Sequence, residues 1–103
     1  MAKFSNFTKE SLTQLIYDVV DEFNENSFEG SKLQKSLDTE LFGPKKTIDS
    51  LDLVDIITAV EEKVDSKFNI PISLEAEDDL AHFQTLETLR DRTFHLLKAR
   101  INI

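Results

Sequence analysis

The segment Ile48-Asp49-Ser50-Leu51-Asp52 places a hydroxyl group where it could accept a covalent group. Asp49 is a predicted N-cap, because an aspartate carboxylate accepts a backbone N–H of the first helical turn. Ser50 is then the first helical residue, with its hydroxyl open to solvent. A helix start favours negative charge, so a phosphodiester on Ser50 would be stabilised there. The negative charges of Asp49 and Asp52 partly oppose this stabilisation, and a modifying enzyme would have to supply compensating cations.

A second apolar set lies on the helix predicted to begin at Asp49, outside the face that a core requires. Its members follow i, i+3, i+7 spacing and alternate with carboxylates; the set is Leu51, Val54 and Thr58, with Asp52, Asp55 and Glu62. A small apolar stripe with a charged rim is typical of a transient docking surface. Two plainer interpretations stay open: Leu51 packs under the preceding loop, or the acids form an ordinary solvated helix face.

The other residues that could bind a metal or act in catalysis form no recognisable set. His82 and His95 lack HExxH spacing and the chain has no Cys, so we expect no zinc site. The acidic residues lack the spacing of a calcium loop. Ser50 is not in a G-x-S-x-G turn, which argues against a Ser-His-Asp hydrolase. The sequence therefore predicts no metal site and no enzyme, with both histidines at the surface or edge.

Three segments show the apolar periodicity of amphipathic helices, namely 8–23, 49–66 and 85–100. Thr8, Asp49 and Thr85 are their predicted N-caps. A shorter helix is predicted over 77–83. The expected core positions are Leu12, Leu15, Ile16, Val19, Val20 and Phe23 in the first helix, Leu53, Ile56, Ile57, Val60 and Val64 in the second, and Leu86, Leu89, Leu96 and Leu97 in the last.

Connections link these helices over 24–48 and 67–76, where turn-forming residues gather. A helical turn is possible at 32–37, and we expect Leu33, Leu37, Leu41 and Phe42 to attach the long connection to the core. No segment shows the alternation of apolar and polar residues that predicts a β-strand. The predicted fold is all-α, a small bundle of three longer helices and one short helix. It forms a single domain over 1–103, with a core of about 8–100.

The chain is acidic, and its charge is uneven. It has 103 residues and a net charge of −8, and residues 49–80 alone carry ten acidic and two basic groups. This charge argues against nucleic acids and anionic lipid surfaces as partners and favours basic protein patches. No apolar run suggests a signal peptide or a membrane span. We expect a cytoplasmic monomer without membrane insertion.

The segment from Asp49 to Glu62 resembles the helix of an acyl carrier protein that bears the phosphopantetheine arm. The tripeptide Asp49-Ser50-Leu51 alone is a weak signal, but its context matches too: the helix order, the long loop before Ser50, Phe68-Asn69-Ile70-Pro71 after the acidic helix, and Thr85-Leu86-Glu87-Thr88-Leu89 at the last helix. The resemblance covers about residues 8–100.

The resemblance implies that Ser50 is the attachment site for 4′-phosphopantetheine, which a phosphopantetheinyl transferase moves from coenzyme A. Acyl intermediates would then travel as thioesters between loading, elongating or transferring enzymes with basic docking patches. Family partner-contact positions match Asp49, Leu51, Asp52, Asp55 and Glu62. In this family the bundle interior can shelter an acyl chain, a role that Phe23, Phe28, Phe68 and Phe83 could serve besides forming the core.

The sequence departs from the pattern of the family at two places, and both concern the identity of the cargo. Lys45-Lys46-Thr47-Ile48 stand where many fatty-acid carriers have a small residue, often Gly, and the loop with Phe42-Gly43-Pro44 is longer. These features resemble specialised carriers of fatty-acid, polyketide or other secondary pathways. Two alternatives stay open: a peptidyl or D-alanyl-type carrier with aminoacyl cargo, and an acidic helical adaptor without a prosthetic group.

Overall fold

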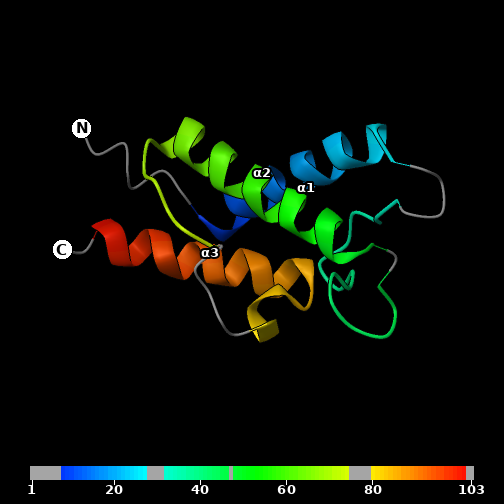
Figure 1. Cartoon of the computed structure of the whole chain (residues 1–103). Helices are drawn as coiled ribbons and strands as arrows, with labels where there is room; N and C mark the ends of the chain where they lie inside the picture. The colour runs from blue at the N-terminus through cyan, green and yellow to red at the C-terminus, as the bar shows by residue number, and fades with distance from the viewer. Residues whose placement is uncertain (1–7, 28–31, 47, 75–79, 102–103) are drawn as a thin grey trace.

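Three α-helices and one short 3-10 helix make up the part of the chain that a computed structural model describes, residues 8–27, 32–46, 48–74 and 80–101. Helix α1 spans Lys9–Glu25, α2 spans Ser50–Phe68, η3 spans Leu80–Phe83 and α3 spans Leu86–Ile101. Helix α1 packs against both α2 and α3, and Figure 1 shows α2 crossing α1 with α3 beneath them. The described residues form no β-structure apart from one isolated bridge. The predicted all-α class is confirmed.

Each α-helix begins directly after its predicted N-cap. In each case the cap side chain accepts a hydrogen bond from the backbone N–H three residues later, and that residue's side chain accepts the N–H of the cap. The pairs are Thr8 with Ser11, Asp49 with Asp52, and Thr85 with Thr88. These local bonds satisfy N–H groups that a helix start leaves without an intrahelical acceptor.

The helix ends differ more from the predictions. Helix α2 continues past residue 66 to Phe68, which is only 7% exposed, and the connection begins at Asn69. Asn69 ends the helix in the left-handed conformation, with φ of 59°, and its N–H donates to the Asp65 carbonyl at 2.8 Å. The short helix occupies Leu80–Phe83 as a 3-10 turn, whereas residues 77–79 of its predicted span lie outside the described residues.

One hydrophobic core lies between the helices, and most of the predicted core positions are buried in it. Phe23, Leu53 and Leu96 are only partly buried at its edge. The connections add buried side chains of their own, which are Leu33, Leu41, Ile48, Ile70 and Leu74. The long connections are therefore packed onto the bundle through apolar anchors.

Asn24 holds the beginning of the long connection against α1. Its side-chain amide donates to the Leu33 carbonyl and its side-chain oxygen accepts the Leu33 N–H, both at 2.8 Å. The amide thus pairs with both backbone groups of Leu33, and the Leu33 side chain is buried beside it. The helical turn predicted at 32–37 is wrong, since residues 32–34 are irregular, residues 35–36 form a bend and residue 37 begins a non-helical turn. Backbone groups engaged in this way cannot also form a helical ladder.

The second half of the long connection is tied to the start of α3. The Leu86 and Glu87 N–H groups donate to the carbonyls of Thr39 and Leu37, at 3.1 and 2.9 Å. The Leu41 N–H in turn donates to the Gln84 carbonyl at 2.8 Å. The Thr39 and Leu37 carbonyls thus serve as acceptors for the N-terminal N–H groups of α3. Helix α2 is therefore preceded by a connection with fixed anchor points on α1 and α3.

Leu33 and Leu41 are buried as predicted, but Leu37 is half-buried and Phe42 is exposed. The expectation that Phe42 attaches the connection to the core is wrong. Leu41 takes the buried position at the Glu40–Thr85 bridge. The N–H groups of Leu41 and Phe42 both donate to the Gln84 carbonyl, so the backbone bends here, and of the two side chains Leu41 enters the core while Phe42 stays exposed.

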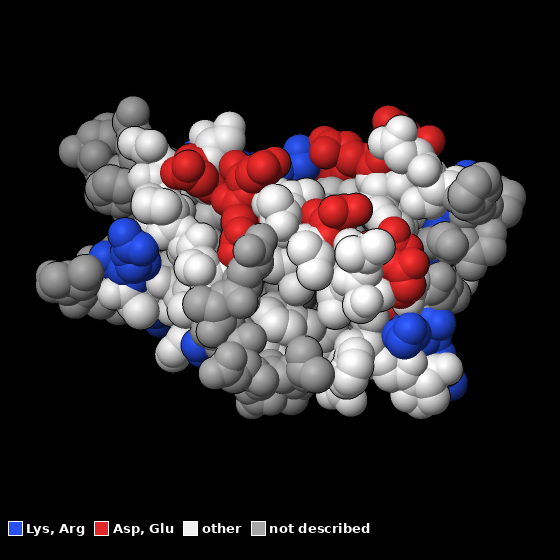
Figure 2. Space-filling model, in the orientation of Figure 1, with Lys and Arg blue, Asp and Glu red and all other residues white. Residues whose placement is uncertain are grey.

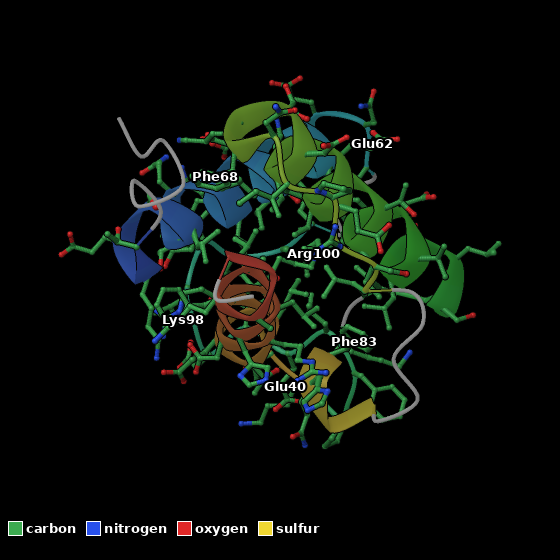
Figure 3. The ribbon with its side chains drawn as sticks, turned by 90° about the vertical axis from the view of Figure 1, so that its left-hand side faces the viewer. Glu40, Glu62, Phe68, Phe83, Lys98 and Arg100 are labelled. Atoms are coloured by element: carbon green, nitrogen blue, oxygen red, sulfur yellow. The ribbon has the colours of Figure 1, made fainter. Side chains whose placement is uncertain are left out.

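Two long-range hydrogen bonds hold the segment after α2 against the bundle. The Glu61 carboxylate accepts the Leu74 N–H, and the Arg100 guanidinium donates to the Pro71 carbonyl at 2.7 Å. Figure 3 shows Arg100 at the end of α3, beneath this segment. None of the described helices combines the length and apolar character needed to cross a membrane.

Candidate functional site

Ser50 occupies the first position of α2 and is exposed. The cap beneath it does not use its side chain: the Asp52 N–H donates to the Asp49 carboxylate at 2.8 Å, and the Leu53 N–H donates to the Asp49 carbonyl at 3.0 Å. The Ser50 hydroxyl makes no hydrogen bond to any described residue. A group attached to this oxygen would therefore break no hydrogen bond between the described residues.

Ile48 fixes the direction in which the chain enters α2. Its side chain is only 3% exposed in the core, and its carbonyl accepts a hydrogen bond from the Lys46 ammonium at 3.0 Å. Two residues further on, the chain emerges at the exposed Ser50. A buried anchor immediately before the cap holds the serine at a defined place on the surface.

The exposed side of α2 presents carboxylates without cationic partners among the described residues. Asp55 and Glu62 are exposed and form no ion pair there. Lys63, on the same helix, is engaged by Glu22 of α1 at 2.7 Å. Figure 2 shows acidic side chains gathered over α2. Such a surface attracts basic patches and repels acidic ones.

The apolar stripe on α2 is exposed in its first two members. Leu51 is 74% exposed and Val54 is 50% exposed, whereas Thr58 is half-buried. The exposure of Leu51 rules out the interpretation in which it packs under the preceding loop. Two large apolar side chains thus stand in water within four residues of Ser50, interleaved with Asp52 and Asp55. The role of these side chains in partner binding stays a prediction.

A groove of about 290 Å³ lies between the end of α1 and the first half of α2. Val19, Phe23, Ile56 and Ala59 supply apolar side chains to its lining. Polar residues complete the lining, namely Glu22, Asn26, Ser27, Asp52 and Asp55. Sequence reasoning missed this groove, because its two walls are far apart in the chain. In this groove Asp52 and Asp55 border apolar side chains as well as solvent.

Three of the four phenylalanines proposed to shelter an acyl chain lie among the described residues. Phe68 and Phe83 are buried in the core (Figure 3), Phe23 borders the groove, and Phe28 lies outside the described residues. The sheltering role stays a prediction.

The histidines lie on the side of the bundle formed by η3 and α3. His82 is half-buried and His95 is exposed, and both line a shallow pocket with Arg92. In the described ranges, no three His, Asp or Glu side chains are grouped so that they could hold a metal ion.

Comparison with known proteins finds a relative that matches most of this chain. Over 76 residues the chain is 34% identical to a protein named acyl carrier protein, mitochondrial, from Saccharomyces cerevisiae. The match covers 74% of this chain and 57% of that relative, so the chain matches little more than half of the relative's length. No protein-family model and no solved structure matches the chain.

Proposed function

We propose that this chain, a homologue of an acyl carrier protein, holds acyl groups as thioesters on a 4′-phosphopantetheine arm attached to Ser50. The match supports the family resemblance of the sequence, and the name of the relative designates a carrier and not an enzyme. The observation that carries the proposal is the position of Ser50, exposed at the mouth of a helix whose cap is complete without it.

The residues around Ser50 fit such an arm. The hydroxyl is exposed and free of hydrogen bonds to the described residues, so it can take a covalent group without unfolding the helix start. The partial positive charge of the α2 N-terminus favours a phosphodiester there. The arm, when attached, supplies a terminal thiol that forms the thioester with the cargo.

The chain itself contributes placement and attraction. Ile48 and the Asp49–Asp52 cap hold Ser50 at a defined point on the surface. We propose that Asp55 and Glu62 steer basic enzyme patches toward it, and that Leu51, Val54 and Thr58 make the apolar contact. Long-range charge attraction with a small contact area gives fast and weak association, which a shuttle between enzymes requires.

The partners that fit this surface are a phosphopantetheinyl transferase and acyl-loading, elongating or transferring enzymes with basic docking patches. We propose that the chain serves a specialised pathway, because Phe42-Gly43-Pro44 and Lys45-Lys46 give it an unusual segment before the site. A cytoplasmic location and a monomeric state stay predictions.

Intact-mass analysis tests the proposal. The chain is incubated with coenzyme A and a broad-specificity phosphopantetheinyl transferase, and a mass gain of one phosphopantetheine is expected. Ser50→Ala should keep its helical circular dichroism and lose the gain. Ser66→Ala is the matched control, because Ser66 is also an exposed serine of α2, and this variant should load normally. Absence of loading in the unmodified chain would favour the adaptor alternative.

A further inference from the structure

The turn that precedes α2 exposes an aromatic side chain. Phe42 is 42% exposed, and together with Leu51 and Val54 it makes up the exposed large apolar side chains of the described residues. All three flank Ser50 in the sequence, one before it and two after it. Large apolar side chains exposed to water on the segments before and after one residue are typical of an interaction surface.

The exposure of Phe42 is fixed by the backbone around it. The N–H groups of Leu41 and Phe42 both donate to the Gln84 carbonyl, at 2.8 and 3.3 Å. Glu40 forms the bridge with Thr85 on the same stretch. In the bend that these bonds form, Leu41 is the buried side chain, at 1% exposure, and Phe42 is the exposed one.

The turn after Phe42 is closed by Glu40 and Gly43. The Glu40 carboxylate accepts the Lys45 N–H at 3.0 Å. Gly43 has φ of 152°, and a Cβ at this position would lie 2.6 Å from the Glu40 carboxylate oxygen. Glycine therefore serves both the backbone conformation and the close approach of the carboxylate. The Glu40–Lys46 turn holds its shape through contacts that do not use the Phe42 ring.

We infer that Phe42 is a partner-contact residue for the enzymes that act at Ser50. This inference rests on the proposed function. The partner is an enzyme whose docking face combines cations opposite the acids of α2 with an apolar socket for an aromatic ring. Figure 2 shows that the acidic surface meets cationic side chains at the end of the molecule where α2 begins. The acidic attraction is therefore locally weakened at this end, and apolar contact takes a larger share of the binding there.

Steady-state loading of Ser50 by a broad-specificity phosphopantetheinyl transferase, with the carrier as varied substrate, tests the inference. For Phe42→Ala we expect KM to rise about fivefold, as for the loss of one well-placed interface side chain. The kcat should be unchanged, since an apolar ring can take no chemical part in the transfer of the phosphopantetheine group. Phe42→Leu should restore most of the loss because it keeps an apolar side chain.

Gly43→Ala provides a second variant, which keeps the Phe42 side chain but changes the turn that carries it. It should raise KM in the same direction, because the added Cβ displaces Glu40 and alters the turn that presents Phe42. Thermal unfolding followed by circular dichroism checks that each variant is folded. An unchanged KM for Phe42→Ala, or a change in kcat alone, overturns the inference while leaving the proposed function intact. Failure of the unmodified chain to load overturns the proposed function itself.

Discussion

Reversal of the Asp55 charge should slow the loading of Ser50 by a transferase with a basic docking patch. Asp55 is exposed on α2, has no cationic partner among the described residues, and borders the groove beside α1. Asp55→Lys turns an attraction into a repulsion of similar size, so the effect is about twice the energy of one ion pair.

The magnitude follows from Coulomb's law with screening. A contact at about 4 Å in water contributes about 1 kcal/mol, so charge reversal changes the interaction by about 2 kcal/mol before screening. At physiological ionic strength, with a screening length of about 8 Å, roughly 1.2 kcal/mol remains, or about an eightfold loss in kcat/KM. At 1 M salt, with a screening length of about 3 Å, roughly 0.5 kcal/mol remains, or a little over twofold.

The assay is kcat/KM for loading, measured from low to high salt for the unmodified chain, Asp55→Lys and Asp65→Lys. Asp65 is the matched control, because it is an exposed aspartate of the same helix, and about 15 Å of helix axis separates it from Asp55. The control changes net charge equally and should lose much less activity. Equal losses for the two variants would mean that overall charge matters and not a docking face. A salt-independent loss would refute the electrostatic reasoning.

The remaining predictions concern stability. Asn24→Ala should lower the free energy of unfolding by about 1–3 kcal/mol in urea titrations, because it leaves the two Leu33 backbone groups without their partner. Asn26→Ala, which removes one 3.3 Å bond within the same helix end, should cost less than about 0.5 kcal/mol, and equal costs would contradict the anchoring role of Asn24. Added magnesium chloride should raise the melting temperature at neutral pH, because residues 49–80 hold ten acidic and two basic groups whose repulsion opposes the compact state. A melting temperature that falls would instead indicate that specific ion pairs dominate.

The helix starts could be predicted because they depend on local chemistry. Thr8, Asp49 and Thr85 each use a side chain and a partner three residues away, and that information lies within a few positions of the sequence. For the same reason the exposure of Ser50 at the start of α2 was accessible from the pattern.

The parts that could not be predicted depend on residues brought together by the fold. Asn24 pairs with Leu33 across a connection, and the groove beside Asp55 needs α1 to lie against α2. The expectation for Phe42 was wrong for the same reason, because the bend at Leu41 and Phe42 is held by hydrogen bonds to Gln84, which is distant in the sequence.

Localisation of the modification by tandem mass spectrometry tests the central claim most directly. The chain is loaded with coenzyme A and a broad-specificity transferase, digested, and the modified residue is identified from peptide fragments. The phosphopantetheine should be found on Ser50 and on no other residue. Modification of a different serine, or no modification of the folded chain, would contradict the assignment of this protein as a carrier through Ser50.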